Sequence, residues 1–243
     1  MIRCIEGYKK FVGLRTKNPH LTTMISVGGW YEGSEKYSDM AKDANRARFV
    51  KSVLDFLQKY DFDGLDLDWE YPANRGGDEV ADKSNFLKLL RELREAFDPH
   101  GYLLTAALSP GKQTMDAAYG DVPLMNELLD WGNVMTYDYH GGWEDILGHN
   151  APLYSRPDET EELERKLHTN YRTFNVNYTV NYYLSLGLKK EKMVMGVPFY
   201  GRGWTLMSKD KHNLHDIAKG MSPEGFLGGE AGVLGYNEVF IEE

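Results

Sequence analysis

The sequence predicts an α/β protein whose parallel strands form a barrel. Stretches with apolar residues at helical spacing alternate with short apolar strands, a pattern typical of parallel sheets. Most predicted strands also end in polar or aromatic side chains, and the carboxyl ends of barrel strands form the rim where sites lie. These ends carry Ser26, Glu70, Tyr137, Asp138 and Tyr200. A doubly wound sheet is the alternative, but the sequence shows no glycine-rich nucleotide loop.

The predicted elements follow in a regular order. Apolar spacing predicts a helix from Ile5 to Leu14, and residues 21–27 read as a strand that Gly28 and Gly29 end. Further helices are predicted over about 43–60, 82–97, 121–129 and 177–186, and further strands over 62–71, 102–108, 131–139 and 192–200. Residues 205–243 are rich in glycine and lack this alternation. We therefore expect a partial barrel domain over 1–204 and a different segment over 205–243.

Composition excludes several classes of protein. With 243 residues, 42% of them hydrophobic and 27% charged, the chain reads as one globular domain. The net charge of −9 argues against a nucleic-acid partner or an anionic membrane surface. A single cysteine, Cys4, excludes an intrachain disulfide framework, and no apolar run is long enough to cross a bilayer. The seven histidines show no metal-ligand spacing, so we expect neither a metal nor a cofactor.

The strand at 62–71 carries the main chemical signal. Side chains alternate between the two faces of a strand, so Asp66, Asp68 and Glu70 share one face, roughly 6.6 Å apart. The opposite face carries Leu65, Leu67 and Trp69. Unpaired ionised groups are costly to bury, so a row of acids indicates chemistry rather than stability. A Mg²⁺ or Ca²⁺ site and a structural carboxylate network are the alternatives.

Four motifs in order resemble one enzyme family. Residues 63–70 (DGLDLDWE) fit the DxxDxDxE signature of glycoside hydrolase family 18, and the chain resembles its chitinases, most closely the arthropod secreted type. The other motifs are SVGGW at 26–30, MTYDY at 135–139 and GVPFYGR at 196–202, which are similar to conserved strands of that family.

The resemblance implies a (β/α)8 TIM barrel of which this chain holds only part. The motifs correspond to strands three to seven, and residues 205–243 to the start of a small α+β insertion. We therefore expect a product truncated at both ends, whose first and last strands are unpaired edges prone to aggregation and which is itself inactive.

Glycoside hydrolysis needs a proton for the leaving oxygen, and Glu70 is the expected acid because burial and a neighbouring carboxylate raise a carboxyl pKa. The resemblance implies that the substrate's own N-acetyl group is the nucleophile. It also implies that Asp68 holds the acetamide nitrogen, that Asp66 shares a proton with Asp68, and that Tyr137 donates to the acetamide oxygen.

Further side chains are expected to bind the sugar chain. By resemblance, Asp138 binds the reacting sugar, Met135 packs beneath it, and Tyr200 and Arg202 line the cleft. Aromatic platforms suit the apolar faces of sugars, and Trp30, Tyr71 and Trp143 stand where rings can reach the rim. Packing roles remain open for Met135, Tyr200 and Arg202, and Ser26 reads as structural because it has no histidine partner.

Two functions follow from the resemblance. The first is a secreted, endo-acting chitinase that cuts β-1,4-linked N-acetylglucosamine polymers and is monomeric when full length. The second is a chitin-binding lectin without hydrolytic activity. An intact acid at Glu70 favours the enzyme, because lectin-type relatives usually replace it. The glycosylation sequon at Asn177 is consistent with secretion.

Overall fold

The computed structural model describes residues 2–227 and 229–239, which divide into two compact units. The first unit contains the residues up to 109 together with 113–134 and 184–194. The second contains 110–112, 135–183 and the described residues from 195 onward.

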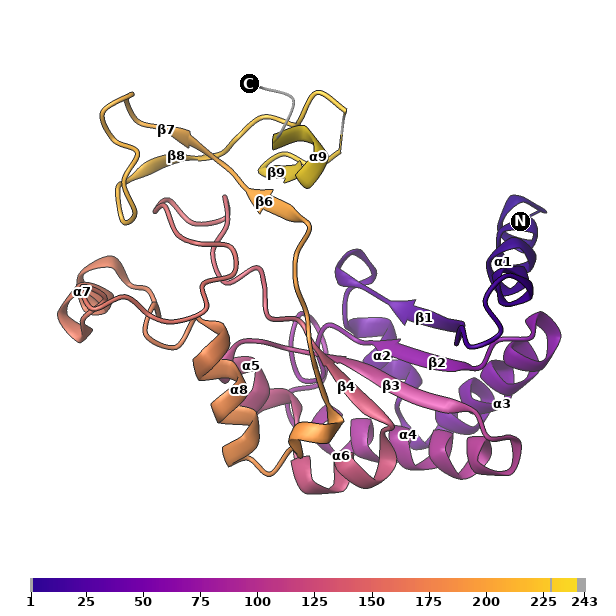
Figure 1. The fold of residues 1–243 in the computed structure, drawn as a ribbon. Helices are drawn as coiled ribbons and strands as arrows, with labels where there is room; N and C mark the ends of the chain where they lie inside the picture. Colours follow the sequence, from indigo (N-terminus) through magenta and orange to yellow (C-terminus); the bar gives the residue numbers. More distant parts are fainter. Residues whose placement is uncertain (1, 228, 240–243) are drawn as a thin grey trace. The chain divides into compact units, whose positions relative to one another are not determined.

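A five-stranded sheet with strand order β1-β2-β3-β4-β5 is the centre of the first unit (Figure 1). The strands are β1 (Met24–Gly28), β2 (Gly64–Asp68), β3 (Leu103–Leu108), β4 (Trp131–Val134) and β5 (Met193–Met195). The pairs β1-β2, β2-β3 and β3-β4 are parallel. The α/β prediction is thus confirmed, and the barrel is not closed within the described residues, where β1 and β5 are the edges of the sheet.

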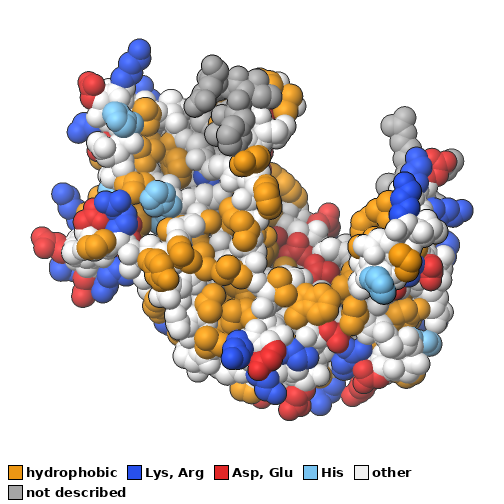
Figure 2. Space-filling model, viewed as in Figure 1, with side chains coloured by type: hydrophobic (Ala, Val, Ile, Leu, Met, Phe, Trp, Pro, Cys, Tyr) orange, Lys and Arg blue, Asp and Glu red, His pale blue; other side chains and the backbone are white. Residues whose placement is uncertain are grey.

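Helices cover one face of this sheet. Figure 1 shows α3 (Asp43–Tyr60), α4 (Asp82–Phe97) and α6 (Val122–Leu128) along that face. The core between sheet and helices contains the fully buried residues Leu57, Leu65, Leu67, Phe86, Leu89, Leu93, Leu104 and Leu108. Acidic and basic side chains mix on the outer side of α4 and α6 (Figure 2). This is the amphipathic pattern from which those helices are predicted.

The remaining helices of this unit surround the sheet ends. They are α1 (Ile2–Val12), η1 (Gly13–Thr16), η2 (Trp30–Glu32), α2 (Glu35–Met40), η3 (Asp98–His100), α5 (Lys112–Ala118), which begins in the second unit, and η4 (Lys190–Lys192). Tyr8 of α1 packs edge-on against Phe56 of α3 and against Phe62, with ring centroids 5.5 and 5.8 Å apart. The apolar spacing in the first helix therefore reflects an aromatic contact with α3 and with Phe62.

The second unit contains two short helices and two antiparallel pairs of strands. The helices are α7 (Glu161–Leu167) and α8 (Val176–Ser185). The pairs are β6 (Tyr200–Arg202) with β9 (Val233–Gly235), and β7 (Trp204–Leu206) with β8 (Ala218–Met221), followed by α9 (Tyr236–Val239). Residues 205–239 therefore contain strands and a helix that the sequence pattern does not predict. Each strand has only three or four residues, too few for a period-two signal.

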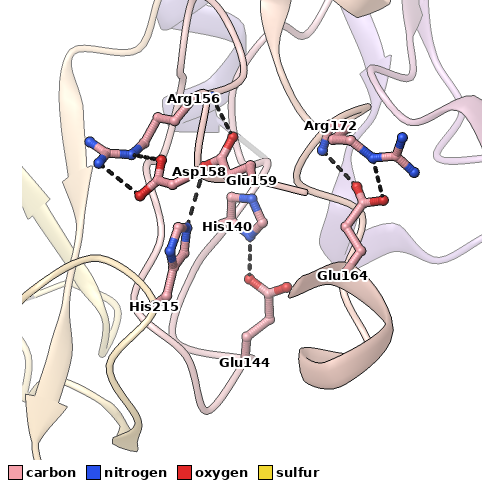
Figure 3. A network of polar contacts seen from close by, with 8 residues as sticks. All are labelled: His140, Glu144, Arg156, Asp158, Glu159, Glu164, Arg172 and His215. Atoms are coloured by element: carbon pink, nitrogen blue, oxygen red, sulfur yellow. Dashed lines mark hydrogen bonds and ion pairs between the residues drawn. The ribbon is translucent and has the colours of Figure 1, made fainter. Parts of the chain in front are cut away.

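Side-chain hydrogen bonds and ion pairs hold the long connections of this unit (Figure 3). His140 Nδ1 lies 2.8 Å from Glu144 Oε2, and Arg172 Nε donates to Glu164 at 2.7 Å. The ring of Tyr171 lies between those of His140 and His215, with centroids 4.6 and 4.5 Å away. His140 is thus held by contacts with Glu144 and Tyr171. Within the described part of the chain, no group of three histidine, cysteine or acidic side chains could hold a metal ion.

Three predicted strands are too long. The strand predicted over 192–200 ends at Met195 as β5. The strand predicted over 131–139 ends at Val134, and Asp138 has a left-handed backbone with φ of 58°. The strand predicted over 62–71 ends at Asp68. Helices α2, α5 and α7 are not predicted from the sequence, because segments of six or seven residues contain too few helical repeats. No described helix is long and apolar enough to span a bilayer.

Candidate active site

The acidic row of the first unit begins on β2. Leu65 and Leu67 are fully buried, whereas Asp66 and Asp68, on the other face, are only partly covered. This alternation confirms the strand geometry expected for the two aspartates. Glu70 differs from the expectation, because it follows the end of the strand rather than continuing it. Acidic side chains gather near the carboxyl ends of β1 and β2 (Figure 2).

Asp66 is held by hydrogen bonds from three other strands of the sheet. Ser26 Oγ of β1 donates to Oδ2 at 2.8 Å. Thr105 Oγ1 of β3 and Asn133 Nδ2 of β4 donate to Oδ1 at 2.6 and 2.9 Å. Ser26, Asp66 and Thr105 are directly in register across the parallel strands. The structural role predicted for Ser26 is therefore to orient Asp66.

Thr105 and Asn133 are site residues that the sequence reasoning missed. Each is a polar residue inside an otherwise apolar strand, LLTAAL and WGNV, and that is the signal that could have identified them. Their partner could not be inferred, because it depends on strand register between segments 39 and 67 residues apart.

Asp68 has the opposite environment. Its Oδ1 is buried and receives no hydrogen bond from the part of the chain that the structure describes. Burial, followed by the charges of Glu70 and Asp66, raises the pKa of Asp68 from 3.8 to about 7. Asp68 therefore takes up or releases a proton near neutral pH.

Glu70 is 92% shielded from solvent and lies at the entrance to the loop that follows β2. Arg75 Nη1 donates to the Glu70 carbonyl oxygen at 3.0 Å. The guanidinium of Arg75 also stacks 3.5 Å from the ring centroid of Trp30, which is 54% exposed. Arg75 was not predicted; it links the loop of the expected acid to the platform expected from Trp30. Burial and then the Glu70 charge raise the pKa of the half-buried Tyr71.

The second unit contains another polar cluster of predicted residues. Asp138 accepts hydrogen bonds from Tyr200 Oη at 2.8 Å and from Arg202 Nε and Nη2 at 2.8 and 2.7 Å. The pair with Arg202 is bidentate, the geometry that most restricts a carboxylate. Burial and the hydrogen bond to Asp138 raise the pKa of Tyr200. Tyr137 packs edge-on against Tyr200 at 6.1 Å between ring centroids.

The aromatic residues of this unit divide into exposed and packed rings. Trp143 is 51% exposed, and the Arg202 guanidinium lies 4.9 Å from its ring centroid. Trp204 instead donates its indole N–H to the Glu144 carbonyl at 3.0 Å, which favours packing over sugar contact. Met135 is partly exposed, and its carbonyl accepts the amide of Tyr137 at 2.7 Å.

The predicted residues thus form two clusters. The first unit groups Asp66, Asp68 and Glu70 with Trp30 and Tyr71. In the second unit, Asp138, Tyr200 and Arg202 are hydrogen-bonded together, with Tyr137 and Trp143 in ring contact, and Met135 precedes them on the chain. The joint contact of Asp68 and Tyr137 with one acetamide stays a prediction.

The first cluster can hold and transfer a proton. Asp66 is fixed by three neutral donors, Asp68 takes up or releases a proton near neutral pH, and Glu70 is a buried carboxyl beside a loop. Burial and neighbouring negative charges raise the pKa of a carboxyl group, and a raised pKa suits such a group to acid catalysis near neutral pH.

Comparisons with known proteins agree on the family. The model of glycosyl hydrolases family 18 matches residues 3–240. The chain is 44% identical over 234 residues to "Probable chitinase 2" of Drosophila melanogaster, covering 96% of this chain and 45% of the fly protein. The chain therefore spans less than half of that relative's length.

Solved structures with the same fold extend the comparison. The Group IV chitinase of Ostrinia furnacalis superimposes with a TM-score of 0.89 at 42% identity, over 97% of this chain and 63% of that one. Human YKL-39, described as a pseudo-chitinase with retained chitooligosaccharide binding, superimposes with a TM-score of 0.85 at 32% identity, over 98% and 64%. The parallel sheet, the acidic row at its carboxyl end and the match over nearly all residues lead to one conclusion: this chain belongs to glycosyl hydrolases family 18.

Proposed function

We propose that the full-length protein is a secreted, endo-acting chitinase that hydrolyses β-1,4-linked N-acetylglucosamine polymers with retention of configuration. The observation that carries this proposal is the intact acidic row. Glu70 is buried and lies two positions after Asp68, whose pKa is raised to about 7. An uncharged sugar polymer also suits a chain with a net charge of −9, which would repel anionic partners.

Glu70 is the general acid in this proposal. It delivers a proton to the glycosidic oxygen as the bond to the anomeric carbon breaks, and it later takes a proton from the attacking water. The substrate's acetamide oxygen attacks the anomeric carbon, so the protein needs no carboxylate nucleophile.

Asp68 and Asp66 support this attack. Asp68 binds the acetamide N–H and stabilises the positive charge that develops on the cyclised intermediate. With a pKa of about 7 it gains or loses a proton at little cost in free energy. Asp66, whose carboxyl group is held in place by Ser26, Thr105 and Asn133, shares a proton with Asp68.

The second cluster binds the sugars. Tyr137 donates its hydroxyl to the acetamide oxygen, and Asp138 binds the reacting sugar while Arg202 and Tyr200 hold it in position. Met135 packs beneath the reacting sugar. The rings of Trp30, Tyr71 and Trp143 pack against the apolar faces of further sugars. More than half of the surface of Trp30 and of Trp143 is exposed, which supports this role.

A chitin-binding lectin is the second candidate. It is favoured by the similarity to human YKL-39, a protein that its description calls a pseudo-chitinase with retained binding. The enzyme remains the preferred reading because Glu70 is present and buried.

Glu70→Gln in the full-length protein tests the assignment. We expect hydrolysis of a chitooligosaccharide to fall by about 10²–10⁴-fold, because the proton donor is lost, while affinity for the same ligand stays within a few-fold. The exposed Glu79, nine positions further on, supplies the matched control Glu79→Gln, which should keep full activity. Unchanged hydrolysis by Glu70→Gln would reject Glu70 as the acid. A wild-type protein that binds but does not hydrolyse would establish the lectin.

The mode of attack on the polymer and the oligomeric state of the protein need separate measurements. An endo-acting enzyme lowers the viscosity of soluble chitin before much reducing sugar is released, whereas an exo-acting enzyme releases reducing sugar before the viscosity falls.

We further propose that the full-length protein is a monomer, which light scattering on the secreted protein tests directly.

A further inference from the structure

The sequence contains one Asn-x-Ser/Thr sequon, Asn177-Tyr178-Thr179, and the proposed hydrolysis makes no use of it. Such a sequon is an acceptor for N-linked sugar, which needs both the asparagine amide and the hydroxyl two residues later. In the folded chain Asn177 is exposed, whereas Thr179 is fully buried. We infer that Asn177 carries an N-linked oligosaccharide and that it can receive this sugar only before the chain folds.

Asn177 is well placed to carry a bulky group. It is an exposed residue in the first turn of α8, and its side-chain oxygen accepts a hydrogen bond from Asn181 Nδ2 at 3.1 Å. Within the described residues no hydrogen bond engages its side-chain nitrogen, the atom to which sugar is attached. Its backbone N–H donates to the carbonyl of Leu153, a residue that is 57% exposed. The surroundings of Asn177 are therefore open to solvent.

Thr179 is the reverse case. It is fully buried, and its hydroxyl is used twice inside the fold. Oγ1 donates to the Pro110 carbonyl at 2.7 Å, and it shares a 2.6 Å hydrogen bond with the buried Tyr139 hydroxyl. A transferase that must contact this hydroxyl cannot reach it in the native chain. Exposing it would break both hydrogen bonds and unwind the first half of α8.

The chemical step is a simple substitution. The donor is a lipid-pyrophosphate-linked oligosaccharide of the secretory pathway. The Nδ2 atom of Asn177 forms a bond to the anomeric carbon of the first sugar, and the bond from that carbon to the pyrophosphate oxygen breaks. The lipid pyrophosphate leaves with the electron pair, and the amide loses one proton to a base of the transferase.

The same threonine is thus required at two stages. In the extended chain it completes the acceptor, and in the folded chain it anchors α8 to the segment that carries Tyr139. Once these contacts form, an unmodified Asn177 stays unmodified.

Translation of the full-length protein into microsomes tests the site. An appended signal peptide directs the chain inside, and protease protection identifies translocated chains before any glycan is scored. We expect wild type and the matched variant Asn181→Gln to carry one more glycan than Asn177→Gln. Digestion with peptide N-glycosidase should convert Asn177 to aspartate in the mapped peptide. An unmodified Asn177 in translocated wild type overturns the proposal.

A second arm tests the timing. Unglycosylated full-length protein is incubated with purified oligosaccharyltransferase and lipid-linked donor, either native or unfolded in a compatible denaturant. We expect modification of the unfolded sample alone, and equal modification of the native sample would reject the role assigned to buried Thr179. Thr179→Ser, which keeps a hydroxyl, should behave as wild type in both samples. Attachment of sugar is the readout, so failure here and failure of the chitinase proposal are distinguishable.

Discussion

Asp66 and Asp68 are the same amino acid two positions apart on one strand, yet the fold gives them different chemistry. Three donors surround the carboxylate of Asp66. Asp68 instead has one buried oxygen without a donor among the described residues, and two acids beside it. Hydrogen bonds favour the charged form of a carboxyl group, whereas burial and like charges disfavour it. The site therefore places a carboxyl group held by three hydrogen bonds next to one with a raised pKa.

The raised pKa of Asp68 predicts a pH dependence of stability. Between 3.8 and about 7 the folded chain holds a proton that the unfolded chain releases. The stabilisation from this group is complete below 3.8 and is lost as pH rises through 7. Asp68→Asn removes the effect, so the melting temperature of wild type should fall relative to the variant between pH 4 and pH 8. Parallel melting curves across that range would contradict the shift.

The bond from Thr105 to Asp66 predicts a cost in folding free energy. Thr105 is 1% exposed, and Thr105→Val leaves the partly covered carboxyl group of Asp66 without one of its donors. We expect a loss of about 1–3 kcal/mol, measured by urea unfolding. Thr105→Ser keeps the hydroxyl and should lose clearly less. If valine is tolerated as well as serine, the hydrogen bond contributes little to holding Asp66.

At the scale of elements, the long helices follow from the sequence alone. The bounds predicted for α3 and α4, 43–60 and 82–97, are those of the structure. Each has four or more turns of amphipathic spacing, enough for the period to identify the helix without tertiary information. The ends of strands are less predictable, as β2, β4 and β5 show, because hydrogen bonding to a neighbour decides where a strand stops.

Helix α6 offers a test of capping. The sequence predicts a helix start at Asp121, and the structure has Asp121 as the N-cap, its Oδ1 accepting the Leu124 N–H at 3.0 Å. Asp121→Ala should cost about 1 kcal/mol in urea unfolding, because one amide at the helix start loses its acceptor. Asp121→Asn can make the same bond and should stay within a few tenths of a kcal/mol. An asparagine variant as unstable as alanine would assign the effect to charge.

At the scale of the whole molecule, the sheet has two edges in the described residues, β1 and β5. Val194 and Met195 of β5 are 47% and 50% exposed. An exposed apolar edge can pair with another chain, and native proteins often block such edges with lysine. We expect the 243-residue chain to associate through exposed apolar edge residues such as Val194 and Met195.

Val194→Lys tests this expectation. The charge should oppose edge-to-edge pairing, so the fraction of monomer in light scattering after size exclusion should rise at equal concentration. Val80→Lys is the control, since Val80 is 89% exposed and lies outside every strand. An equal gain from both lysines would point to general solubility rather than to the edge.

The sequence alone determined the α/β class, the family motifs and the presence of the acidic row, because these depend on periodicity and spacing within short segments. It placed Asp66 and Asp68 on one face, and it contains the glycosylation sequon at Asn177. Only the tertiary structure decided which donors hold Asp66, that Asp68 has a raised pKa, that Glu70 lies beyond its strand, and that Thr179 is buried against Tyr139. These facts depend on strand register and on contacts between residues about 40 to 67 positions apart, and local sequence pattern contains no information on either.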